Sequence, residues 1–258
     1  MTMGNYYLVC AAVLVATYTV NTTYVTVFYH RGLAHGGVEL RPGVRRFVAA
    51  TGSWVTGLDP KAWACMHRQH HQYADTARDP HSPRNVGILG VLVAQFIAYK
   101  ANLALLIMGH PKYTKIVEDI EFPVSWINRR SWVIPYAVHL AIAIAIGAAA
   151  GAWLLGAAYF IGLMSHPIQG WMVNALGHAH GYRNFDTPDG SRNNTLVALL
   201  VVGEGYQNNH HRNPCSPTMA VKWYEIDLGY VLCRILGLCG LVTIPISPST
   251  HQPSGSAP

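Results

Sequence analysis

Cys65-Met66-His67-Arg68-Gln69-His70-His71 is the stretch around which this chain is organised, because it places three imidazoles within five residues directly after an apolar run. On a helix, His67 and His71 are one turn apart and His70 is three residues on from His67. The three rings then lie on neighbouring faces and can converge on metal. The stretch therefore predicts a helix that carries metal ligands.

Three more short histidine groups stand elsewhere in the chain, and with the first they make four boxes: His30-x4-His35, Asn174-x3-His178 and Gln207-x2-His210-His211. Eight of the fourteen histidines fall in these boxes. Neutral imidazole suits iron, copper, zinc or nickel, and eight such donors are too many for one ion that keeps an open position. The pattern therefore indicates two metal ions.

Composition indicates the medium that these histidines face. Of the 258 residues, 51% are hydrophobic and only 12% are charged, about half the usual charged fraction. This balance predicts an integral membrane protein. We interpret the net charge of +6 as positive-inside bias and attraction for anionic head groups, and expect no nucleic acid partner. The five cysteines contain no CxxC pair, which favours buried thiols over disulfides.

The first apolar run, residues 6–29, is long enough to cross a bilayer and lacks the features of a cleaved signal peptide. Four arginines follow it within about seventeen residues and none precedes it, so its C-terminal end should face the cytoplasm. The next run, 47–64, is interrupted at Gly57, Asp59, Pro60 and Lys61 and is expected to lie in the membrane interface.

Three later apolar runs, 86–108, 132–155 and 157–177, are further candidates to span the membrane. An even number of them must cross if His178 is to join the same cytoplasmic cluster. The run 86–108 is the weakest, because it carries Gln95, Lys100 and Asn102. We therefore predict three spans, one helix and then a hairpin. Polar residues inside the last span mark a kinked segment that must face protein, cofactor or a cavity: Ser165, His166, Pro167 and Gln169.

The remaining segments complete the predicted fold class, an all-α integral membrane protein with about three transmembrane helices, interfacial helices and a cytoplasmic histidine-rich cap for the two metal ions. We expect a short helix over 196–203 and an amphipathic interfacial helix over 220–244. Residues 1–245 should form one membrane domain, and the Pro/Ser-rich residues 246–258 a disordered tail.

The four boxes, in this order, resemble those of the membrane fatty acyl desaturase family, in particular the branch that includes the stearoyl-CoA desaturases. The likeness extends to Asp79-Pro80-His81, to residues 177–186 after the third box, and to Gly203-Glu204-Gly205-Tyr206 before the last. It spans residues 25–235. By this resemblance the family's iron ligands fall on His30, His35, His67, His70, His71, His178, His210 and His211, and Asn174 matches a position that holds a metal-bound water.

The resemblance implies a dioxygen-dependent desaturase of lipid metabolism and fatty acid biosynthesis. Two iron ions would use dioxygen and two electrons to remove two hydrogens from a methylene pair and leave a cis double bond. The acyl substrate would be carried by CoA, by acyl carrier protein or in a membrane lipid. The sequence contains no His-Pro-Gly-Gly signature of a b-type cytochrome domain, so we expect electrons to come from a separate ferredoxin-like or cytochrome-like protein. Hydroxylation or acetylene formation at the same site, or a non-catalytic membrane metal-binding protein, are the alternatives.

Two features of the boxes need their own interpretation. The family branch usually begins its last box with histidine, whereas this chain has Gln207, which could ligate weakly or orient a metal-bound water. Nearby carboxylates could accept the free ring N–H of a ligating histidine, or could pair with arginines instead; the candidates are Asp75, Asp79, Asp186, Glu204 and Asp227. The resemblance also places Tyr18, about three turns before His30, at the far end of an acyl tunnel.

Overall fold

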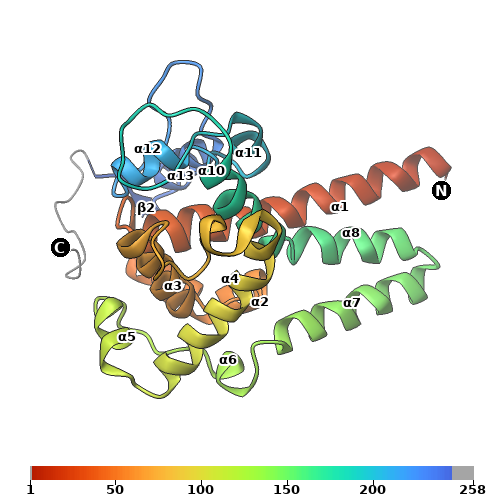
Figure 1. The fold of residues 1–258 in the computed structure, drawn as a ribbon. Coiled ribbons are helices and arrows are strands. Elements are labelled where there is room, and N and C mark those ends of the chain that lie inside the picture. The colour runs from red at the N-terminus through yellow and green to blue at the C-terminus, as the bar shows by residue number, and fades with distance from the viewer. Residues whose placement is uncertain (1, 246–258) are drawn as a thin grey trace.

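Helices make up most of the structure, a computed structural model that describes residues 2–245 (Figure 1). Within these residues the only strands are β1 (Glu39–Leu40) and β2 (Val242–Thr243), which pair antiparallel. The predicted all-α class is therefore confirmed for the described part of the chain. The predicted tail, residues 246–258, lies outside it.

Three apolar helices run side by side away from the rest of the molecule (Figure 1). They are α1 (Met3–Thr23), α7 (Ile134–Ala150) and α8 (Trp153–Leu163), and α8 packs against both of the others. None of them contains a lysine, arginine, aspartate or glutamate. Such uniformly apolar helices can face lipid on every side that they do not pack.

Among residues 2–245, two helices are both long and apolar enough to cross a membrane. One is α1 with its continuation η1 (Tyr24–Ala34), together 32 residues, and the other is α4 (Pro83–Ile107). The sequence rated this second run as the weakest candidate because of its polar residues. In the structure two of the three face protein: Gln95 donates to the Pro167 carbonyl (2.7 Å) and Asn102 accepts from Gln69, whereas Lys100 is exposed. The helix packs on α3, α9 and η2 rather than on α7 or α8.

The predicted interruption before the second box is confirmed. Helix α2 (Pro42–Thr56) ends at Gly57, whose φ of +77° suits glycine, and a Cβ there would lie 2.4 Å from the ring of Tyr136. Helix α3 (Pro60–Tyr73) then begins with Asp59 as its N-cap, which accepts from the Ala62 amide at 2.9 Å. The break turns α3 so that its histidines point into the protein.

The predicted kink in the last apolar run is also present. Helix α8 ends at Leu163, and the chain restarts as α9 (His166–Trp171), η2 (Met172–Leu176) and α10 (Gly177–Ala179). The carbonyl that the break releases at Leu163 accepts from Asn21 Nδ2 on α1 at 2.7 Å. A buried polar contact therefore fixes the kink against the first helix.

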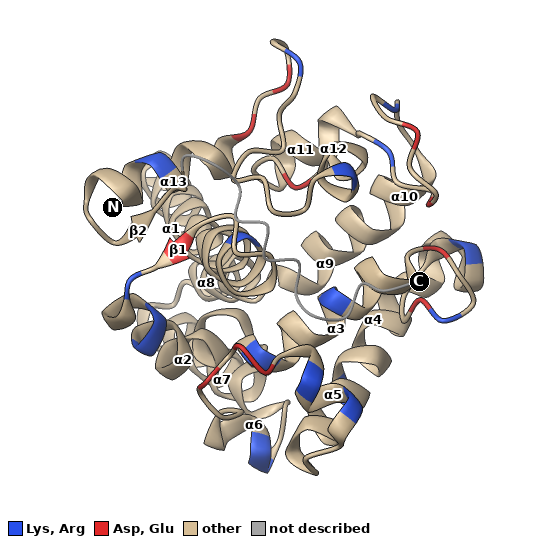
Figure 2. Cartoon of the chain, turned by 90° about the vertical axis from the view of Figure 1, so that its left-hand side faces the viewer, with Lys and Arg blue, Asp and Glu red and all other residues tan. Residues whose placement is uncertain are grey.

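The remaining helices lie with α2, α3 and α4 at the end of the molecule opposite the tips of α7 and α8, and this whole end is called the cap (Figure 1). They are α5 (Pro111–Ile116), α6 (Trp126–Arg130), α11 (Thr195–Leu200), α12 (Gln207–Arg212) and α13 (Leu228–Leu238). Figure 2, which views the cap from the end opposite the tips of α7 and α8, shows the charged residues on these short helices and their loops.

The helix predicted over 220–244 is wrong in extent, because only Leu228–Leu238 is helical. Its N-terminal part is a loop in which Glu225 accepts from the amides of Val221 (2.6 Å) and Lys222 (2.8 Å). Asp227 then caps the helix by accepting from the Tyr230 amide at 2.9 Å. Acidic side chains that bind amides locally compete with helix formation.

Candidate metal centre

Five of the eight predicted histidines meet in one buried group: His30, His35, His67, His71 and His210. Their Nε2 atoms face one another. His35 and His67 approach to 2.8 Å, His67 and His71 to 3.1 Å, His71 and His210 to 3.0 Å, and His210 and His30 to 3.0 Å. One ring nitrogen from each residue lies within 4.8 Å of the others, so five donors converge on one point.

The first box reaches this point through unusual helix geometry. In an α-helix, residues five apart are separated by about 140° around the axis, so His30 and His35 would point in different directions. Segment η1 is instead a π-helix, in which the His35 amide donates to the His30 carbonyl at 3.2 Å. The two ring centroids are therefore only 5.0 Å apart. The sequence carried no signal for this conformation.

The other three predicted histidines form a second group: His70, His178 and His211. Each points Nδ1 at a carboxylate. His70 contacts Asp79 at 2.9 Å, His178 contacts Asp75 at 2.9 Å, and His211 contacts Asp189 at 3.0 Å. Their Nε2 atoms are buried and have no hydrogen-bond partner among residues 2–245.

Two His-His pairs divide between the groups. His71 and His210 belong to the group of five, whereas their chain neighbours His70 and His211 belong to the group of three. The rings of His71 and His211 stack across the divide at a centroid distance of 4.4 Å. The three rings of the second box therefore do not share one centre, because consecutive helical residues point about 100° apart.

Carboxylates behind the histidines were partly predicted. Asp75, Asp79 and Glu204 take the expected role, the last through contact between its Oε2 and Nδ1 of His30. Asp186 does not: it lies 3.7 Å from Arg183 and is fully exposed, and Asp189 contacts a histidine instead. Asp227 pairs with Arg31 (3.0 Å) rather than with a histidine.

Both groups have the chemistry of a metal site. Burial, and then repulsion from neighbouring histidines, holds the pKa of His67 and His71 well below the usual histidine value, so these rings are neutral at pH 7. Burial alone would raise the pKa of Asp79, but hydrogen bonding and attraction from His70 lower it to about 2. The neutral rings direct buried lone pairs toward one point, and ionised carboxylates contact the other nitrogen of four of the eight rings. This arrangement is suited to binding a cation.

The carboxylates give a direct test. Asp79→Asn removes the negative charge behind His70 while keeping the side chain's size, and we expect it to weaken metal binding by about tenfold to a hundredfold. Asp186→Asn is the matched control, because Asp186 contacts no histidine. The measurement is the metal that each variant retains after dialysis against increasing concentrations of a chelator. Equal retention by the two variants would contradict the role of Asp79.

A cavity adjoins the group of five. Its lining includes the histidine rings of His30 and His67, together with Trp63, Asn174 and residues of α9. The Trp63 indole stacks on His67 at 4.9 Å with an interplanar angle of 11°. Asn174, on the π-helical segment η2, is half-buried and lies within this lining. A ligand in the cavity would therefore lie against the histidines on one side and Asn174 on another.

Gln207 lies beside the centre and points into the protein. Its Nε2 donates to the Glu204 carbonyl at 2.7 Å, and its side chain packs on Gly177, where a Cβ would lie 2.8 Å from Gln207 Cγ. Glu204 in turn contacts His30. The position of the glutamine is therefore suited to holding the loop that carries Glu204.

Tyr18 and His81 each make a contact that was not predicted. The Tyr18 hydroxyl donates to the Leu200 carbonyl at 2.5 Å, and Tyr18 is not part of the cavity lining. His81 stacks on His70 at 4.8 Å, and both of its ring nitrogens are buried without a partner among the described residues.

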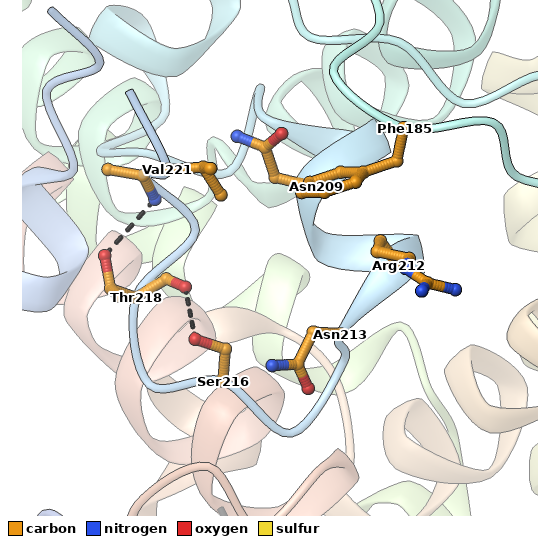
Figure 3. Close-up of a pocket in the computed structure, with 8 residues that line it drawn as sticks. Phe185, Asn209, Arg212, Asn213, Ser216, Thr218 and Val221 are labelled. Carbon is orange, nitrogen blue, oxygen red and sulfur yellow. Dashed lines mark hydrogen bonds between the residues drawn. The ribbon is translucent and has the colours of Figure 1, made fainter. Parts of the chain in front are cut away.

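A second hollow, of about 390 Å³, opens next to the last box and shares no lining residue with the first (Figure 3). Arg212 and Asn213 form one wall, and Ser216, Thr218 and Val221 form the other. Asn209 closes the interior by donating to the Met219 carbonyl (2.8 Å). This hollow is polar and connects the solvent with the helix that carries His210 and His211.

Comparison with known proteins agrees with the geometry. The model of the fatty acid desaturase family matches residues 6–234. Icosanoyl-CoA 5-desaturase of Limnanthes douglasii is 32% identical over 231 residues, which cover 88% of this chain and 62% of that protein. Delta-9 acyl-lipid desaturase 1 of Arabidopsis thaliana is 30% identical over 243 residues, 93% of this chain and 76% of that protein.

A third relative differs in its named reaction. Hex-5-enoyl-(acyl-carrier protein) acetylenase of Moorena producens is 30% identical over 245 residues, which cover 89% of this chain and 74% of that protein. The resemblance seen in the histidine boxes is thus confirmed over most of the chain. This protein belongs to the fatty acid desaturase family, whose members are oxidoreductases that act on fatty acyl chains.

Proposed function

We propose that this protein is a membrane-embedded di-iron fatty acyl desaturase, which converts a methylene pair of an acyl chain into a double bond. The observation that carries the proposal is the convergence of eight imidazoles into a group of five and a group of three, in contact with each other. Imidazole and carboxylate surroundings suit iron, and two adjacent donor sets suit a dinuclear centre. Bound iron would supply the reduction of dioxygen and the removal of hydrogen from unactivated carbon.

The chain's own residues would hold and orient this chemistry. The eight histidines would be the ligands, and Asp75, Asp79, Asp189 and Glu204 would keep the proton of four of them on Nδ1, so that Nε2 presents its lone pair. Asn174 and Trp63 would position the substrate methylenes beside the group of five. Burial of most of these side chains would exclude bulk water from the reaction.

The arrangement of charge supports a membrane orientation with three spans. Helices α1, α7 and α8 are free of charged residues and extend to one side, whereas the arginines that follow η1 and precede α7 lie on the cap (Figure 2). By the positive-inside rule the cap and its histidines would face the cytoplasm. Helix α4 would then lie within the cap, where α3, α9 and η2 pack on it.

Substrate carrier and electron source belong to the same proposal. The relatives are named for acyl-CoA, acyl-lipid and acyl-carrier-protein substrates, so this chain would take an acyl chain on one of these carriers. Electrons would come from a ferredoxin-like or cytochrome-like protein that docks on the cap. Acetylene formation is the second candidate reaction, which the similarity to an acetylenase supports.

The test is the acyl composition of cells that express the chain together with a reductant system, compared with cells that express His70→Ala. We expect new unsaturated acyl chains only with the unaltered chain. Mass spectrometry of products distinguishes a double bond from a triple bond or a hydroxyl group. Exchangeable zinc or copper with no reductant-dependent oxygen consumption would instead identify a non-catalytic metal-binding protein.

A further inference from the structure

The cavity beside the group of five carries polar side chains that a plain hydrocarbon chain cannot use. Two of them, His166 and Gln169, lie three residues apart on α9 and are only 8% and 2% exposed. Residues with this spacing share one face of a helix. Buried polar atoms nearly always have a hydrogen-bond partner, so an unpartnered one in a binding cavity indicates what its ligand offers.

The amide orientation of Gln169 is fixed by its neighbours. Asn21 donates through Nδ2 to the carbonyls of Leu163 (2.7 Å) and Val55 (3.2 Å), so its Oδ1 is an acceptor. Gln169 Nε2 donates to this Oδ1 at 3.1 Å and to Ser165 Oγ at 2.6 Å. The atom left over is Gln169 Oε1, a buried acceptor without a partner among residues 2–245.

The tautomer of His166 follows from Trp63 in the same way. An indole N–H can only donate, and Trp63 Nε1 lies 3.2 Å from His166 Nε2. Nε2 must therefore accept, and the proton of the neutral ring is on Nδ1. That N–H is also buried and unpartnered within the described chain. Trp63 also stacks on His67, so one indole ring contacts both His166 and a histidine of the group of five.

We propose that the acyl chain taken by this protein carries a hydroxyl group, which accepts from His166 Nδ1–H and donates to Gln169 Oε1. A methylene at this place would leave both buried atoms unsatisfied, and a carbonyl oxygen would satisfy only the histidine. His166 and Gln169 thus select a chain with a hydroxyl group and fix which of its carbons lies beside the metal centre. This inference rests on the proposed function, since it takes the hydroxyl-bearing carbon of the acyl chain to enter this cavity.

A bound water is the competing occupant. The free volume of the cavity is about 50 Å³, which is enough for one water molecule. A water that bridged His166 and Gln169 would make the pair a structural feature, and a plain chain would then be the preferred ligand. The two explanations predict opposite preferences between plain and hydroxylated chains.

The experiment compares binding of medium-chain acyl-CoA thioesters, either saturated or carrying one hydroxyl at successive carbons, to the full-length purified protein by calorimetry. We expect one hydroxylated isomer to bind at least about tenfold more tightly than the saturated chain, the change that one to two buried hydrogen bonds give. Gln169→Leu and His166→Phe should each reduce this ratio to within about twofold. Ile168→Ala, which alters an exposed residue of the same helix, should keep it.

Two results would overturn the inference. One is a saturated chain that binds as tightly as every hydroxylated isomer, and the other is a ratio that stays unchanged in both variants while their metal content and melting temperature match the parent. The proposed function is judged separately. If the metal-loaded parent converts none of the chains to an unsaturated product, the desaturase assignment fails whatever the binding ratio is.

Discussion

His71→Ala is expected to remove bound metal and to lower turnover by more than about a hundredfold, since even partners behind the ligands change metal affinity by about tenfold to a hundredfold. The position of this ring explains the size of the effect. Its Nε2 lies 3.1 Å from that of His67 and 3.0 Å from that of His210. The ring also stacks on His211 of the other group, so its loss disturbs both donor sets.

The same loss is expected for His67→Ala and His211→Ala, one from each group. Iron per protein by plasma mass spectrometry and product formed per minute are the two measurements. His180→Ala is the matched control, because His180 is exposed and lies only two residues from His178. An active parent protein that contains one zinc and no iron would disprove the di-iron proposal.

The local part of the candidate metal centre could be predicted from sequence. Ligands that share a helix have fixed spacing, and the four boxes therefore named all eight histidines that meet in the two groups. Local rules also gave the break at Gly57 to Lys61 and the kink near Ser165, because each depends on residues adjacent in the chain. Both breaks turn a helix so that its histidines enter the protein.

The division of these histidines between two centres could not be predicted. It depends on how α3, η1, α10 and α12 pack, and packing joins residues far apart in sequence, such as His30 and His210. Hydrophobic periodicity likewise does not predict that η1 is a π-helix. Asp189 was missed because it lies 22 residues before His211, outside every box, and only the folded loop brings its carboxylate to the ring.

The error over 220–244 has a related cause. Hydrophobic periodicity continued through residues 220–227, but Glu225 and Asp227 bind backbone amides there, and the helix begins only at Leu228. The same Asp227 also pairs with Arg31, which lies 196 residues earlier in the chain. The residue at which this helix begins thus depends on Asp227, which also takes part in a long-range ion pair.

Arg31→Met is expected to destabilise the folded protein by about 3–5 kcal/mol, the usual cost of breaking a buried ion pair from one side. Arg31 is almost completely buried. Its Nη1 lies 2.5 Å from Glu204 Oε1, its Nη2 lies 3.0 Å from Asp227 Oδ1, and its Nε donates to the Pro217 carbonyl at 2.9 Å. Without the guanidinium, two carboxylates would remain buried with no cation between them.

The measurement is thermal unfolding of the detergent-purified protein. Arg31→Lys should recover only part of the loss, because one ammonium group cannot reach three acceptors that the planar guanidinium meets together. Arg212→Met is a matched control, because Arg212 is an exposed arginine on α12. An Arg31→Met protein that melts with the parent would show that the ion-pair network does not stabilise the fold.

Metal binding should be coupled to this network, because Glu204 contacts both Arg31 and the ring of His30. In the parent protein, removing the metal leaves Glu204 with one cationic partner. In Arg31→Met it leaves none, so chelation should lower the melting temperature more in the variant than in the parent. Groups that share a partner give such non-additive effects, whereas independent groups give additive ones. Equal shifts in melting temperature would show that Arg31 stabilises the fold independently of the metal. A larger shift in Arg31→Met would show that the buried arginine and the metal ions neutralise the same carboxylate.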